Sequence, residues 1–156
     1  MKNKIKTGVI ITDDKNRVLL IKEKIKKNDK ALWNIIKGSY GDRRENIFKA
    51  SQRECLEEIG VNIEIEGFQG CYVAQKDTTN YVMLIFNARI TKGEPRPKTP
   101  EEQRDKNEDI KELKWFTKKE VSRIKKNDFI SNRIHFIMKD WLKNNKTPLN
   151  SIKQIE

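Results

Sequence analysis

The chain has 156 residues, of which 35% are hydrophobic and 37% charged, and its net charge is +11. The length suffices for one domain with a real core, the composition excludes a disordered chain, and no stretch reaches the roughly 20 apolar residues of a membrane span. The charge suits a phosphate-rich partner such as RNA or a nucleotide, although lysine that is abundant throughout the chain explains it equally well.

Two short apolar segments near the start of the chain predict strands. Lys4–Thr12 has an apolar middle, and Arg17–Lys24 contains the run Val-Leu-Leu-Ile. The polar turn between them predicts a hairpin at the start of a sheet. After the polar loop 25–30, Ala31–Ile36 predicts a third short strand that leads into a glycine-containing loop.

A helix is predicted over residues 46–59. Asn46 is suited to accept hydrogen bonds from the first turn, and Gly60 ends the helix because glycine readily adopts the left-handed conformation. A mostly apolar stripe runs along the helix, formed by Ile47, Ala50, Ser51, Leu56 and Ile59. This stripe is expected to face the core.

Three acidic residues of this helix, Glu54, Glu57 and Glu58, are expected on the face opposite the stripe. Their spacing brings the carboxylates together, where like charges repel. A solvated acidic face is one interpretation, but the rest of the chain is strongly basic and the glycine-containing loop leads directly into the helix. Clustered oxygen ligands bind hard cations such as Mg²⁺ together with substrate phosphates. The pattern therefore indicates metal-assisted attack on a phosphoanhydride.

The segment 39–61 resembles the Nudix box of the MutT-like pyrophosphohydrolases, G-x5-E-x7-R-E-U-x-E-E-x-G-U, in which U is a bulky aliphatic residue. The positions that match in register are Glu45, Arg53, Glu54, Glu57, Glu58, Gly60 and Val61. Cys55 takes an aliphatic position, where it packs as a small hydrophobe. Ser39 stands where the box begins with glycine, although Gly38 comes just before it.

This resemblance implies an α/β (α+β) fold of the Nudix type, an α/β/α sandwich in which helices flank a mixed central sheet. Residues 1–142 are expected to form a single Nudix domain, and residues 143–156 a loosely ordered C-terminal tail. The resemblance also implies a metal-dependent pyrophosphohydrolase with Mg²⁺ or Mn²⁺ as cofactor. Its substrate would be a nucleoside diphosphate linked to another moiety, cleaved at a phosphoanhydride bond.

The roles of the site residues follow from the same resemblance. The metal ligands would be the carbonyl of Gly38 and the carboxylates of Glu54, Glu57 and Glu58. Glu45 and Arg53 match the pair that ties the loop to the helix, since a guanidinium makes bidentate bonds to a carboxylate. The general base is open between Glu57 in the box and three later residues, Glu101, Glu102 and Glu108.

Lys37 and Trp33 are the candidates for substrate binding, together with Gly38. Lys37 stands where family members often have proline, and it is expected either to contact a substrate phosphate or to be solvated. Trp33 could stack on the base of a nucleotide, as could Tyr40, Phe68 and Tyr72. The alternative for each aromatic residue is a place in the core. The single histidine, His135, is expected to pack or to lie at the surface.

The second half of the chain predicts further strands over Asn62–Glu66, Phe68–Gln75, Asn80–Ile90 and Ile110–Phe116. Gly67 is expected to turn the chain between the first two. Thr91–Asn107 contains three prolines and predicts a long loop. Thr117 begins a helix with a capping box, and Phe129–Leu142 predicts an amphipathic last helix.

Three functions remain open from the sequence. The first is a hydrolase for a small nucleotide-type substrate, and the second an RNA 5′-pyrophosphohydrolase or decapping-type enzyme. The third is a non-catalytic nucleotide-binding module, which Ser39 alone favours. Cys55 and Cys71 form no C-x-x-C pair, so reduced thiols in a cytoplasmic protein are expected. No membrane partner is expected, and a homodimer is left open.

Overall fold

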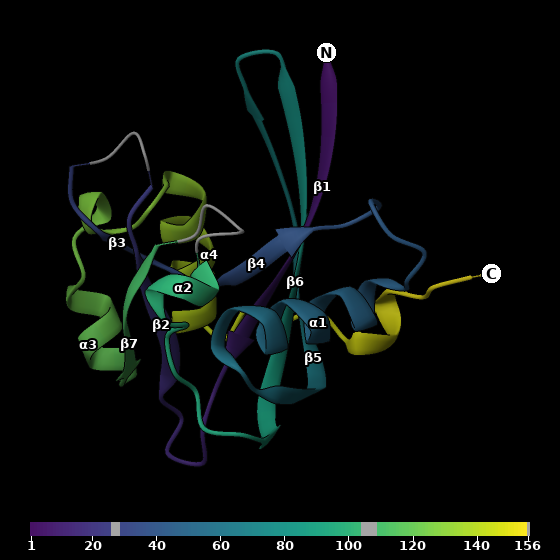
Figure 1. Ribbon diagram of the computed structural model, residues 1–156. Helices are drawn as coiled ribbons and strands as arrows, with labels where there is room; N and C mark the ends of the chain where they lie inside the picture. Colours follow the sequence, from purple (N-terminus) through teal and green to yellow (C-terminus); the bar gives the residue numbers. More distant parts are fainter. Residues whose placement is uncertain (26–28, 104–108, 156) are drawn as a thin grey trace.

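The computed structural model describes residues 1–25, 29–103 and 109–155. Within them, seven strands form two sheets (Figure 1). The first sheet has the order β4 (Ile36–Ser39), β1 (Lys2–Ile11), β6 (Thr79–Lys92), β5 (Asn62–Lys76). It is mixed, because β1 runs parallel to β6 while its other pairs are antiparallel. The second sheet is antiparallel, with the order β3 (Leu32–Asn34), β2 (Val18–Glu23), β7 (Ile110–Phe116).

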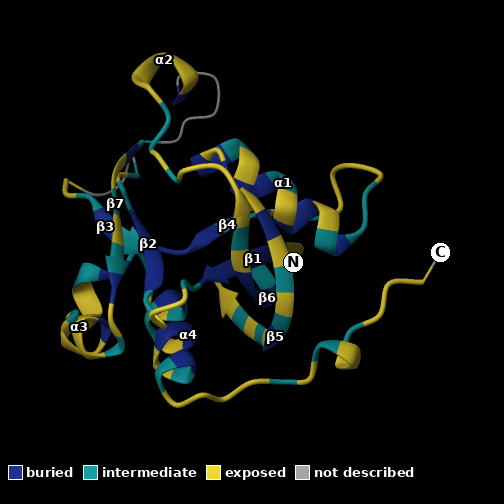
Figure 2. Ribbon diagram, turned by 90° about the horizontal axis from the view of Figure 1, so that it is seen from below, coloured by how far each residue is buried: buried dark blue, intermediate teal, exposed yellow. Residues whose placement is uncertain are grey.

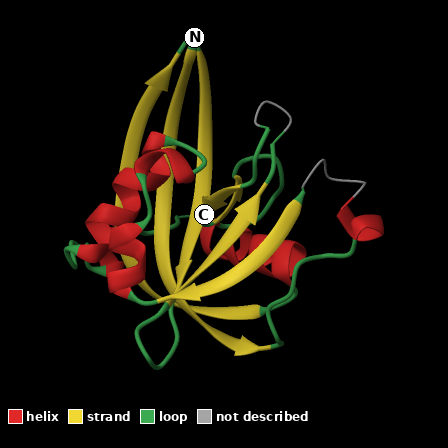
Figure 3. Cartoon of the chain, turned by 90° about the vertical axis from the view of Figure 1, so that its left-hand side faces the viewer, coloured by secondary structure: helices red, strands yellow, loops and turns green. Residues whose placement is uncertain are grey.

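Helices lie on both sides of the strands (Figure 3). Helix α1 (Ile47–Ile59) packs against β1, β4 and β5, and α4 (Asn132–Leu142) lies on the other side with α3 (Lys118–Arg123). The remaining helical turns are short: α2 (Pro100–Gln103), η2 (Lys126–Asp128) and η3 (Leu149–Ser151). The expected mixed fold, with a central sheet flanked by helices, is confirmed. None of the described helices is long and apolar enough to cross a membrane.

The core has two main parts, one on each side of the strands. Val9 and Ile11 of β1 join the cluster under α1, which includes Cys55 and Ile59, whereas Ile10 joins the cluster under α4. Successive side chains of a strand point to opposite faces, so covering both faces buries consecutive residues. The buried parts of these strands, residues 7–11 of β1 and 18–21 of β2, lie in the middle of the molecule (Figure 2).

The hairpin predicted from the first two segments is wrong. Strands β1 and β2 belong to different sheets and meet at an isolated bridge between Thr12 and Val18. The strand predicted over Ala31–Ile36 is also divided, because the chain leaves β3 at Asn34 and enters β4 at Ile36. This crossing from one sheet to the other places the glycine-containing segment in a strand next to α1.

The turn predicted at Gly67 is wrong as well. Strand β5 continues through this residue, and its register with β6 shifts between Ile65 and Gly67 and again between Phe68 and Gly70. Such bulges bend a strand without ending it. The two strands expected before and after Gly67 are therefore one long strand, which pairs with β6 along its whole length.

The C-terminal elements agree with the sequence in kind. Thr117 and Glu120 form the expected capping box, and α4 begins three residues later than expected because Ser131 caps it. In the segment 143–156, the Thr147 amide donates to the Phe68 carbonyl at 2.9 Å. Leu149 and Ile152 of that segment pack against the cluster that holds Phe68. Both cysteines are free, as expected.

Candidate active site

Local signals set the limits of α1. The Asn46 side chain accepts from the Lys49 amide at 2.8 Å, and Gly60, with φ of 74°, donates its N–H to the Leu56 carbonyl at 3.1 Å. Both predicted caps are confirmed. A hydroxyl pair between Thr7 of β1 and Ser51 of α1 then fixes the helix against the sheet.

The predicted faces of α1 are partly wrong. Leu56 is 51% exposed, and Cys55 is buried in its place. Ser51, Cys55 and Ile59 are spaced four residues apart and face the sheet, so Glu54 and Glu58, one position earlier, lie at the margin of that contact. Glu54 is 9% exposed and Glu58 is 6% exposed, so only Glu57 of the three glutamates is half-exposed.

Gly38 of β4 and Glu54 of α1 approach each other so closely that a side chain at position 38 would displace the Glu54 carboxylate. A Cβ atom on Gly38 would lie 2.0 Å from Cδ of Glu54. The register explains the contact, because Gly38 lies opposite Thr7, which itself contacts α1. The strand backbone and the carboxylate therefore form one wall of the site.

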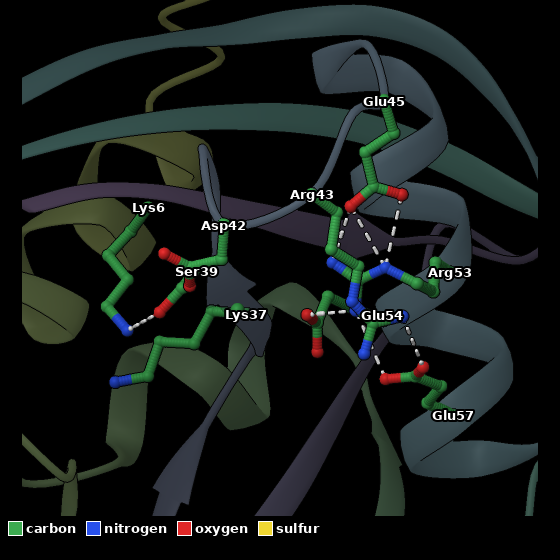
Figure 4. A pocket seen from close by; sticks show the side chains of 10 residues that line it. Lys6, Lys37, Ser39, Asp42, Arg43, Glu45, Arg53, Glu54 and Glu57 are labelled. Carbon is green, nitrogen blue, oxygen red and sulfur yellow. Dashed lines mark hydrogen bonds and ion pairs between the residues drawn. The ribbon is translucent and has the colours of Figure 1, made fainter.

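Arg53 connects three carboxylates from a central position (Figure 4). Its Nε atom donates to Oε2 of Glu45 at 3.2 Å and its Nη2 atom to Oε1 at 2.8 Å, which is the bidentate pairing implied by the family resemblance. Its Nη1 atom donates to Glu54 at 2.7 Å and to Glu57 at 3.1 Å, contacts that the sequence analysis did not foresee. These hydrogen bonds, those to Glu45 above all, raise the pKa of Arg53.

A cleft of about 350 Å³ opens beside this network. The predicted site residues that line it are Lys37, Gly38, Glu45, Arg53, Glu54 and Glu57. Sequence reasoning missed four others, Lys6, Ser39, Asp42 and Arg43. Lys6 belongs to β1 and reaches the cleft because it pairs with Ser39, a register that no local pattern reveals.

Two predicted site residues do not line the cleft. Glu58 is buried on α1, and its charge adds to the effect of burial in raising the pKa of Cys55. The Trp33 ring packs edge-on against Phe116 with centroids 4.8 Å apart, and it borders a different hollow beside Lys22. Trp33 is therefore placed away from the carboxylates.

The family model described as NUDIX domain matches residues 2–137. The chain belongs to the NUDIX family. This match confirms the resemblance found in the sequence, and with it the expectation of a Nudix hydrolase. The described residues that line the cleft thus belong to the Nudix box, apart from Lys6, Lys37 and Gly38, which lie outside it.

Solved structures of Nudix proteins share the fold. A NUDIX hydrolase from Nitrosomonas europaea is 22% identical with a TM-score of 0.78, and the match covers 99% of this chain and 98% of that one. A MutT NUDIX hydrolase from Burkholderia pseudomallei is 20% identical with a TM-score of 0.69, covering 90% and 98% of the two chains. A UDP-X diphosphatase is 13% identical with a TM-score of 0.66, covering 95% and 66%. A comparison with curated proteins finds no match.

The serine at the first position of the Nudix box causes no backbone strain. Ser39 is an exposed residue of β4 and does not have a positive φ, and its hydroxyl accepts from Lys6 Nζ at 2.7 Å. Gly38 is the residue whose missing side chain the site requires. The departure at position 39, the only sequence feature that favoured a non-catalytic module, therefore has no structural cost.

Among the loop candidates for a general base, Glu102 is less suited to this role than Glu57. Glu102 is held by side-chain hydrogen bonds from Arg96, which lower its pKa to about 2, and it also accepts from the Thr99 amide. A general base works best with a pKa near the working pH. Glu101 is exposed on α2, and Glu108 lies outside the described residues.

The donors at the cleft fit a divalent cation in their chemistry. Carboxylate oxygens and a backbone carbonyl are the ligands that Mg²⁺ and Mn²⁺ prefer. Within the described residues, no three acidic, histidine or cysteine side chains converge closely enough to form a ready-made metal site. Arg53 forms ion pairs with both Glu54 and Glu57, so a cation would compete with Arg53 for these carboxylates.

Arg53→Met should destabilise the protein, because it leaves three carboxylates near one another without their shared cation. The side chain is 18% exposed, so we expect a loss of about 2 kcal/mol, less than for a fully buried pair. The measurement is the free energy of unfolding in urea. Arg89→Met is the matched control, because Arg89 also pairs with two carboxylates, Asp14 and Glu66, but at the surface. Equal effects of the two changes would contradict this account.

Proposed function

We propose that this Nudix hydrolase cleaves a phosphoanhydride bond in a nucleoside diphosphate linked to another moiety, with Mg²⁺ or Mn²⁺ as cofactor. The observation that supports this most strongly is the contact between Gly38 and Glu54, since it places a buried carboxylate against the backbone of a strand that lines the cleft. The nearby cleft has the positive side chains Lys6, Lys37 and Arg43 for phosphates.

The proposed metal ligands are the carboxylates of Glu54, Glu57 and Glu58 with the carbonyl of Gly38. A divalent cation held there would neutralise phosphate charge and increase the acidity of a water molecule. Glu57 is the proposed general base, because it is half-exposed at the cleft. It would accept a proton as the water oxygen bonds to phosphorus and the bond to the bridging oxygen breaks.

Glu45 and Arg53 have a positioning role in this proposal. Arg53 holds Glu45 at one end of the network and Glu54 and Glu57 at the other, so it fixes the approach of the box loop to α1. The guanidinium already has three carboxylate partners, which argues against Arg53 as the main phosphate ligand. Substrate phosphates would instead meet the lysines on the other side of the cleft.

Turnover with a substrate panel tests the proposed function. The panel contains nucleoside triphosphates, sugar nucleotides, dinucleoside polyphosphates and 5′-triphosphorylated RNA, each with magnesium and with manganese. We expect metal-dependent release of a nucleoside monophosphate or phosphorylated product from at least one class. Absence of turnover throughout, from a protein with a cooperative unfolding transition, would contradict the proposal. The panel also decides between a small nucleotide and an RNA end.

A further inference from the structure

A row of positive side chains lies on the far side of β4 from the acidic helix. Lys37 neighbours Gly38 but points to the opposite face of the strand, as does Lys6, which lies across from Ser39 on β1. Figure 4 shows both ammonium groups extending to the same side of the cleft, away from Glu45 and Glu57. The two lysines and the carboxylates thus lie on opposite sides of the same cleft.

Arg133 of α4 continues this row. Lys6 pairs in register with Met83 of β6, and Met83 lines a hollow of about 440 Å³ together with Arg133 and Phe136. The Arg133 guanidinium lies over the Tyr81 ring, 4.3 Å from its centroid, which fixes its position. Arg133 also belongs to the first turn of α4, which has no acidic residue, so the helix dipole adds to the positive potential.

The three cations are close enough to influence one another. Burial lowers the pKa of Lys37, the negative charges of Glu23 and Glu58 raise it, and the positive charges of Lys6 and Arg133 lower it. Glu23 also accepts a hydrogen bond from the side-chain amide of Asn34 at 2.8 Å. Lys37 thus has both positive and negative neighbours, and the row is defined by the positions of its three side chains on β4, β1 and α4.

We propose that Lys6, Lys37 and Arg133 bind phosphate oxygens beyond those that meet the carboxylates, and that the substrate is a 5′-triphosphate. This inference rests on the proposed function and narrows its substrate class. A terminal phosphate ionises twice, so a triphosphate carries more negative charge than a diphosphate esterified to a neutral sugar. A sugar nucleotide would leave part of this cationic row without a counter-charge.

The hollow next to Arg133 indicates how the bound substrate is oriented. Its walls include Tyr72, Met83 and Phe136, and the Phe136 side chain is 62% exposed. Tyr72 is held in place by a hydrogen bond from its hydroxyl to Asp140 at 2.9 Å. The strand order β4, β1, β6, β5 places the cleft at β4 first, then Lys6 on β1, and then the hollow over β6 and β5. This sequence matches the order of phosphates and base in a nucleotide.

Binding in the absence of metal tests the cationic row by itself. In EDTA, we expect a non-hydrolysable nucleoside triphosphate analogue to bind the wild-type protein, and Lys37→Met to weaken it by roughly 10-fold or more. The affinity for a sugar nucleotide should fall by less than about 2-fold in the same variant, because this ligand contacts fewer of these charges. Lys6→Met is the second variant if Lys37→Met fails to fold. Lys111→Met, an exposed lysine paired with Asp109, is the matched control.

Turnover with metal separates this inference from the proposed function. We expect kcat/KM of the wild-type enzyme to favour triphosphates, and Lys37→Met to remove the preference mainly through KM. A preference for sugar nucleotides, or equal losses for both classes, would overturn the inference while leaving the hydrolase intact. Absence of all turnover would contradict the proposed function. The binding experiment in EDTA would still show whether the cationic row binds phosphates.

The salt dependence of binding distinguishes two sources of the triphosphate, an RNA end and a free nucleotide. A 5′-triphosphorylated RNA should bind with a steep dependence on salt concentration, because several phosphates along the strand release counterions. A free nucleoside triphosphate should show a shallow dependence. Either result supports the triphosphate assignment, provided that Lys37→Met weakens binding. Binding of RNA that is indifferent to its 5′ phosphates would overturn it.

Discussion

Glu57→Gln should lower kcat by roughly 10²–10⁴-fold, because the amide can neither accept the proton from water nor supply a negative charge to a cation. The side chain keeps its size, and Arg53 retains Glu45 and Glu54 as partners. The unfolding transition should therefore change little. The measurement is steady-state turnover of the best substrate at several metal concentrations, combined with a urea unfolding curve.

The matched control is Glu64→Gln, which removes an equal charge from an exposed position on β5. It should leave turnover unchanged, so a loss in Glu57→Gln cannot be a general effect of net charge. Turnover of Glu57→Gln near that of the wild type would exclude Glu57 as general base and as an essential ligand.

Gly38→Ala should be almost as damaging, for a steric reason. The new methyl group would lie 2.0 Å from Glu54 Cδ, so the carboxylate must move, and Arg53 would lose the contact now at 2.7 Å. Overpacking of this kind costs about 1–3 kcal/mol of stability. A displacement of about 1 Å in an active site can cost roughly 10²-fold in rate, so we expect kcat to fall by about that much.

The comparison for this variant is the neighbouring residue. Ser39→Gly restores the glycine that begins the Nudix box, yet it should leave turnover within about 3-fold, since Ser39 is exposed and unstrained. If Ser39→Gly raised turnover strongly while Gly38→Ala were harmless, the site would depend on position 39, and the assignment of Gly38 would be wrong.

The elements that sequence reasoning predicted well are those with local signals. Helix α1 has a capping asparagine and a terminal glycine, and β7 was predicted with its observed limits, Ile110–Phe116. The hairpin between the first two segments failed because strand pairing depends on distant residues. Strand β1 pairs instead with β4 and with β6, and the partner on β6 is more than seventy residues away along the chain.

The candidate site was predictable where its residues share one motif. The pairing of Glu45 with Arg53 is present, but the further contacts of Arg53 depend on the side-chain directions on α1. Leu56 is exposed although its apolar side chain predicts burial, because the sheet packs against the helix face that carries Cys55 and Ile59. Lys6 and Arg133 could not be found, since only the strand registers and the packing of α4 bring them near Lys37.

Crystals grown with Mn²⁺ and a non-hydrolysable nucleoside triphosphate, measured for anomalous scattering by manganese, test the central claim most directly. We predict a manganese peak in contact with the carboxylates of Glu54 and Glu57 and with a phosphate oxygen. Manganese and phosphates bound elsewhere, with both carboxylates still on Arg53, would contradict the claim that this face of α1 gathers metal and phosphoanhydride.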